Sequence, residues 1–75
     1  MSNPETKDKL LKAVELELLA NKHKNEANLA VYLNNPVGIG EHPDIVEEVM
    51  TMIKNIAEAE DGLAVLRNNF KNRDK

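Results

Sequence analysis

The sequence predicts an all-α protein, an antiparallel helical hairpin that assembles into an oligomeric helical bundle. Apolar residues recur at helical spacing in both halves of the chain. Apart from Pro4 and Gly62, every proline and glycine lies between residues 36 and 43, so this stretch separates two long helices. The 75 residues allow one domain, 1–75, whose short polar ends we expect to be frayed.

The first helix is expected at about residues 4–34, either with Asn3 as its cap and Pro4 following, or with a later start at Thr6. No proline or glycine interrupts residues 6–35. The early segment is apolar almost all round, and a later stripe of mostly small residues would let another helix approach closely. The stripe consists of Ala20, His23, Ala27 and Ala30.

The second helix is expected at about residues 43–70. Two apolar rows repeat every seven positions, namely Val49, Ile56, Leu63 and Phe70, and beside them Ile45, Met52, Ala59 and Leu66. Pro43 suits the first helical position, with Glu41 or His42 as the cap. Acidic residues follow in the first turns, where the helix dipole favours negative charge. Gly62 is expected to weaken this helix by about 1 kcal/mol relative to alanine.

Matching the two helices across the loop places Tyr32 near Ile45 and Leu10 near Arg67, to within about one helical turn. Both helices carry more apolar residues than one buried stripe requires. The chain has no cysteine, so disulfides cannot stabilise so small a core. We therefore expect a homo-oligomer, either a dimer that forms a four-helix bundle or a tetramer.

Composition and spacing also exclude several function classes. The net charge is −3, with 13 acidic against 10 basic side chains, which argues against binding DNA or RNA. No apolar run approaches the roughly 20 residues that span a bilayer, and the polar N-terminus does not resemble a signal peptide. We expect a soluble, intracellular protein. His23 and His42 are too far apart for a local metal motif, and no catalytic triad or dyad is evident. We expect no enzymatic activity, metal or cofactor.

The central loop is the first candidate for ligand binding. Its glycines would let the backbone approach a ligand closely, and the helix that follows presents free N–H groups to anions. The acidic turn that begins this helix opposes a self-contained anion site. Alternatively, the loop only turns the chain, its apolar residues cover the end of the bundle and its asparagines end a helix. The loop candidates are Asn34, Asn35, Pro36, Val37, Gly38, Ile39, Gly40 and His42.

Four further side chains are candidates for the same site. The ring of Tyr32 could stack on a base, or pack beside Ile45. Lys22, Lys24 and Arg67 could meet phosphates, or remain solvated charges. The chain also contains ten asparagines, whose amides either read base edges or decorate the surface and cap helices. We expect residues 32–42 to form one wall of a pocket that another subunit completes.

Residues 32–44 (YLNNPVGIGEHPD) and 56–60 (IAEAE) resemble a group of very small tailed-phage proteins. That group resembles in turn the oligomeric phage "sponge" proteins, which sequester cyclic dinucleotides and so blunt bacterial CBASS immunity. The resemblance covers roughly the C-terminal 45 residues. It implies a compact helical tetramer with nucleotide pockets between protomers, no turnover, and a location in the cytoplasm of the infected bacterium.

Two candidate functions remain, the first implied by the resemblance and the second by the exposed apolar face, beside a structural oligomer that has no ligand. The first is a phage immune-evasion sponge that binds a cyclic dinucleotide without turning it over. The second is a coiled-coil interaction module that docks a host or virion protein and has no small-molecule ligand. The second function requires a large apolar patch that remains uncovered after self-assembly.

Overall fold

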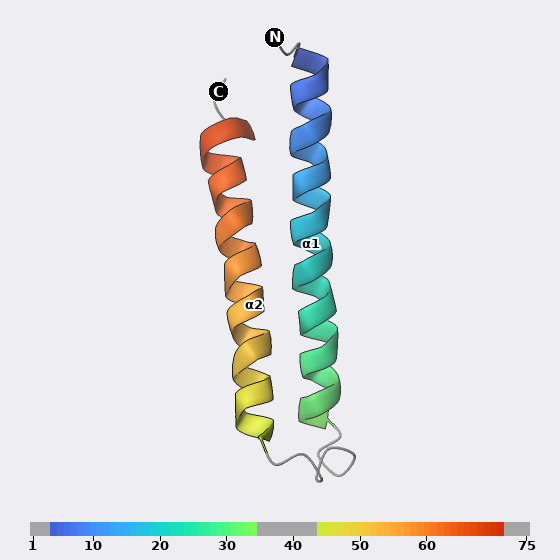
Figure 1. Cartoon of the computed structure of the whole chain (residues 1–75), viewed down its shortest axis with the longest axis vertical. Coiled ribbons are helices and arrows are strands. Elements are labelled where there is room, and N and C mark those ends of the chain that lie inside the picture. The colour runs from blue at the N-terminus through green and yellow to red at the C-terminus, as the bar shows by residue number, and fades with distance from the viewer. Residues whose placement is uncertain (1–3, 35–43, 72–75) are drawn as a thin grey trace.

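The computed structural model describes residues 4–34 and 44–71. It contains helix α1 (Pro4–Asn34), helix α2 (Ile45–Leu66) and a short π-helix, η2 (Arg67–Lys71), which continues α2. The two long helices lie side by side and antiparallel (Figure 1), and no strand occurs in the described ranges. The all-α helical hairpin predicted from the sequence is therefore confirmed.

The bounds of α1 agree with the prediction, whereas α2 begins two residues later than expected. At this end the carbonyl of Asp44 accepts a hydrogen bond from the N–H of Glu48 at 3.0 Å. The Asp44 side chain makes no capping hydrogen bond. The predicted caps Asn3, Glu41 and His42 lie outside the described residues.

The helices meet along one seam, in which buried and half-buried positions of each helix alternate at spacings of four and three; Leu19, Gly62 and Ala64, also half-buried, border it. This spacing keeps a single row of side chains facing the neighbouring helix. On α2 the row is entirely apolar, while on α1 it includes three polar residues. The seam consists of Leu11, Glu15, Leu18, Lys22, Asn25, Leu29 and Tyr32 on α1, and Ile45, Val49, Met52, Ile56, Ala59, Leu63 and Leu66 on α2.

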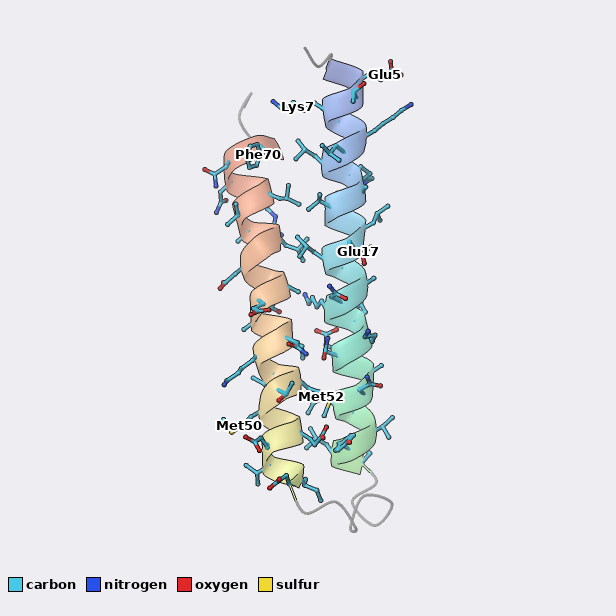
Figure 2. The ribbon with its side chains drawn as sticks, viewed as in Figure 1. Glu5, Lys7, Glu17, Met50, Met52 and Phe70 are labelled. Carbon is cyan, nitrogen blue, oxygen red and sulfur yellow. The ribbon has the colours of Figure 1, made fainter. Side chains whose placement is uncertain are left out.

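The buried core is thin and comes from one helix. Its buried apolar side chains are Met52, Ala59, Leu63 and Leu66, all on α2. Figure 2 shows Met52 between the helices and Met50, two residues earlier, on the outer side of α2. Among the described residues no side chain is less than 2% exposed. The hairpin by itself therefore gains little from hydrophobic burial, which scales with the apolar area removed from water.

The register of the hairpin is defined by two contacts across the seam. A Cβ atom added to Gly62 would lie 3.0 Å from Leu18 Cδ1, and Asn55 hydrogen-bonds Asn25. In an antiparallel pair of helices, the residue numbers of opposing residues have a constant sum, which defines the register. This sum is 80 for both observed pairs and 77 for the predicted partners Tyr32 and Ile45. The difference of three residues is less than one helical turn, so the estimated pairing was accurate within the margin given for it.

Much apolar surface remains uncovered in this single chain, as the sequence led us to expect. The exposed large apolar side chains are Leu10, Val14, Leu16, Val31, Leu33, Val46, Met50, Ile53, Val65 and Phe70. Within residues 4–34 and 44–71, no helix is long and apolar enough to cross a membrane. The oligomer that would cover this surface stays a prediction.

Candidate ligand-binding site

A polar layer interrupts the seam near its middle. Asn25 is buried, with 8% of its surface exposed. Its Nδ2 donates to the carbonyl oxygen of Asn21 at 2.7 Å, and its Oδ1 accepts from Nδ2 of Asn55 at 3.1 Å. Both ends of the buried amide are thus hydrogen-bonded, which offsets the cost of taking it out of water. The layer joins α1 to α2 through a polar contact at a position where coiled coils usually place an apolar residue.

An ion pair lies beside this layer. Nζ of Lys22 is 3.5 Å from Oε2 of Glu60 on the other helix. The Lys22 side chain is 27% exposed, because its aliphatic part occupies a seam position while its ammonium group reaches the surface. With Glu60 55% exposed, the pair is largely solvated and contributes modestly, about 0–1 kcal/mol.

An open depression of about 390 Å³ adjoins the polar layer. Both helices line it, and its walls combine amide, cationic, anionic and apolar groups. The lining residues are Leu18, Asn21, Lys24 and Asn25 on α1, and Asn55, Glu58 and Ala59 on α2. Within the part of the chain that the structure describes, the side chain of Asn21 and Oδ1 of Asn55 have no hydrogen-bond partner. These amide groups are available to a ligand.

The depression defines one side of the seam. Four of its lining residues each stand one position before a seam residue. They are Asn21 and Lys24 on α1, and Asn55 and Glu58 on α2. Because successive helical residues diverge by about 100°, residues one position after a seam residue lie on the opposite side. We call the first side the polar flank and the second the apolar flank.

Exposed apolar side chains lie on both flanks, but in different arrangements. On the polar flank they stand toward the two ends of the depression, and they are Leu10, Val14, Val31 and Val65. The apolar flank carries Leu16, Leu33, Val46, Met50 and Ile53. The polar depression is thus bordered along the helices by exposed apolar side chains, which a second chain packed over the depression would remove from water.

The structure separates the predicted site residues. Lys24 lines the depression. Lys22 is a seam residue outside it, and its ammonium group pairs with Glu60, which stands one position after Ala59 and so on the apolar flank. Tyr32 is half-buried in the seam, seven residues and therefore about 10 Å along α1 from Asn25. Its predicted stacking role stays a prediction. Asn34 ends α1, where its Nδ2 donates to the carbonyl oxygen of Ala30 at 2.9 Å.

Arg67 is exposed at the start of η2, where its backbone N–H donates to the carbonyl oxygens of Leu63 and Ala64. It lies twelve residues beyond Asn55, about 18 Å along the axis of α2. Arg67 and Tyr32 therefore stand toward opposite ends of one protomer and cannot share a site within it. The remaining loop candidates, Asn35, Pro36, Val37, Gly38, Ile39, Gly40 and His42, lie outside the described residues.

Most of the depression was not identified from the sequence, because its two walls lie about 30 residues apart. One signal was present. Asn25 falls in the same seven-residue row as Leu11, Leu18 and Tyr32, so it interrupts an otherwise apolar or aromatic row. A lone asparagine in such a row indicates a polar layer in the seam.

Metal ligands do not gather anywhere in residues 4–34 and 44–71, where no group of three or more His, Cys, Asp or Glu residues could hold an ion. His23 is exposed, and its Nδ1 lies 3.1 Å from Oε1 of Glu26 on the same helix. Comparison with known proteins found no matching family model, no matching curated protein and no matching solved structure.

Proposed function

We propose that this protein is a non-enzymatic sponge that sequesters a cyclic dinucleotide at the depression beside the seam. The observation that carries the proposal is the combination of free amide groups and a lysine in one depression shared by both helices. Amides both donate and accept hydrogen bonds, which suits the edges of nucleobases. Lys24 supplies a cation for a phosphate, and Leu18 and Ala59 supply apolar contacts.

The size of the depression supports a ligand that also contacts a second protomer. A volume of about 390 Å³ is at the lower end of small-molecule sites, and the depression is open to solvent. A second protomer packed on the apolar side chains that border the depression, such as Val14 and Val65, would close it. This arrangement agrees with the pockets between protomers that the phage-sponge resemblance implies. The same resemblance supplies the ligand class and the role in immune evasion inside an infected bacterium.

Isothermal titration of the full chain against a panel of cyclic dinucleotides tests the proposal. We expect micromolar or tighter binding of at least one member, and no conversion of the nucleotide on prolonged incubation. Asn55→Ala should weaken that binding about tenfold, because it removes an amide that faces the ligand. Asn68→Ala is the matched control, since Asn68 is exposed on η2 and lies outside the depression. Absence of heat with every member, at protein concentrations well above micromolar, would exclude the sponge.

A second candidate function is favoured by the apolar flank. This flank presents five apolar side chains on one side of the hairpin, each with between 48% and 73% of its surface exposed. They are Leu16, Leu33, Val46, Met50 and Ile53. If self-assembly leaves this flank uncovered, we propose that it docks a host or virion protein, as amphipathic helices do in apolar grooves. Hydrogen exchange of the assembled protein tests this second function. Rapid exchange along the apolar flank is expected if the flank is free to dock a partner, whereas protection there would mean that another protomer covers it and would exclude docking.

A further inference from the structure

Glu58 is an unexpected component of a site for a nucleotide. It lines the depression together with Lys24, yet neither side chain forms an ion pair among the described residues. A carboxylate repels phosphate, so Glu58 works against any ligand that enters the depression phosphate first. A ligand that binds here needs a group that donates hydrogen bonds on the Glu58 side.

Among nucleobases, guanine fits this requirement best. An ionised carboxylate only accepts hydrogen bonds, and its two oxygens can accept two parallel ones. Guanine presents two adjacent donors on one edge, N1–H and the N2 amino group. Adenine and cytosine place a ring acceptor beside their amino donor, and uracil places its single N–H between two carbonyls. Only guanine therefore pairs with both carboxylate oxygens without opposing an acceptor to one of them.

The other lining residues agree with such an orientation. A guanine on Glu58 directs its O6 to the side, where amide N–H groups of Asn21 or Asn55 are donors of the right kind. The phosphate then points away from Glu58 toward Lys24 on the opposite helix, so that the like charges are kept apart. Leu18 and Ala59 offer apolar contact to the ring between them.

We propose that the depression recognises a guanine-containing cyclic dinucleotide, with Glu58 accepting hydrogen bonds from N1 and N2 of the base. This inference rests on the proposed function and specifies the base that the site selects. It does not depend on the loop, on Tyr32 or on Arg67.

The test compares cyclic di-GMP with cyclic di-AMP by isothermal titration of the full-length protein. The unmodified protein should bind cyclic di-GMP at least about tenfold more tightly, which is the discrimination expected of one good bidentate contact. Glu58→Gln keeps the size of the side chain but places an amide donor opposite the guanine donors, so the preference should fall about tenfold. Glu47→Gln on the same helix is the matched control, because Glu47 is exposed and outside the depression.

Each outcome has one interpretation. Equal binding of the two nucleotides, or a preference that Glu58→Gln leaves unchanged, overturns the guanine assignment while the sponge proposal stands. Binding of neither nucleotide, nor of any other member of the panel, overturns both. Circular dichroism of the Glu58→Gln protein, which should match the unmodified chain, excludes misfolding as the cause of a lost preference.

Discussion

At position 62, helix α2 has no side chain where Leu18 of α1 crosses it. A Cβ atom there would lie 3.0 and 3.2 Å from the two Cδ atoms of Leu18, closer than most real contacts. The glycine thus permits the helices to approach beside the polar layer, at the cost of a less stable helix. Leu18 also lines the depression, so its branched end has open space on one side.

Gly62→Ala should therefore stabilise the hairpin. Alanine improves the helix by up to about 1 kcal/mol, and Leu18 can turn a few tenths of an ångström toward the depression. Urea unfolding followed by circular dichroism measures the change in the free energy of unfolding. Gly62→Leu is the control, since a large side chain cannot fit against Leu18 and should destabilise the protein. A loss of stability in Gly62→Ala itself would mean that Leu18 cannot move.

At the scale of the element, the two helices contribute unequally to the seam. The seven seam positions of α2 are all apolar, whereas α1 places Glu15, Lys22 and Asn25 among its seven. Glu15 is half-buried and lies 3.5 Å from Nζ of Lys12. Polar residues at such positions lower stability and restrict which register the helices adopt. The register of α1 against α2 thus depends on polar contacts in its middle and on apolar packing toward its ends.

The Lys22–Glu60 pair should contribute little to stability by itself. In a double-mutant cycle of Lys22→Ala and Glu60→Ala, we expect a coupling energy below about 1 kcal/mol, because both groups are solvated. The coupling should fall further in 1 M salt, where the screening length is about 3 Å. A cycle between Lys54 and Glu60, which form no ion pair, provides the baseline. A coupling of several kcal/mol, unchanged by salt, would contradict the solvated geometry.

At the scale of the whole molecule, the hairpin is a rod of 53 × 18 × 18 Å with a thin core and extensive exposed apolar surface. Ten large apolar side chains are exposed among the described residues, and apolar surface gathered on a flank indicates a contact with another chain. Two flanks carry such surface, and each suits a different contact. A partner on the polar flank would close the depression, while one on the apolar flank would cover Val46, Met50 and Ile53.

Light scattering should find a dimer or a tetramer at tens of micromolar protein. Val65→Lys should reduce the assembly toward smaller species, because Val65 borders the depression that a second protomer is proposed to close, and a charge there would enter a contact that excludes water. Asn68→Lys adds the same charge at an exposed position of η2, away from both flanks, and should leave the assembly unchanged. A folded monomer of the unmodified chain would contradict the packing argument for self-association.

The fold class and the bounds of α1 followed from the sequence by itself, and those of the second helix followed to within two residues, although its last turns form the π-helix η2. They depend on local features, namely apolar spacing along each helix and the placement of proline and glycine, and these act within a few residues. Of the candidate site, the sequence identified Lys24 as a candidate contact for phosphate, but it did not connect Lys24 with Asn55 or Glu58.

Only the tertiary structure brought those residues together, because the register of one helix against the other is set by packing across 30 or more residues of chain. A shift of three residues, too small to alter the fold class, decides which side chains face one another. It places Leu18 on Gly62 and Asn55 on Asn25. The hairpin is thus determined by periodicity, whereas the depression is determined by how two periodic surfaces fit together.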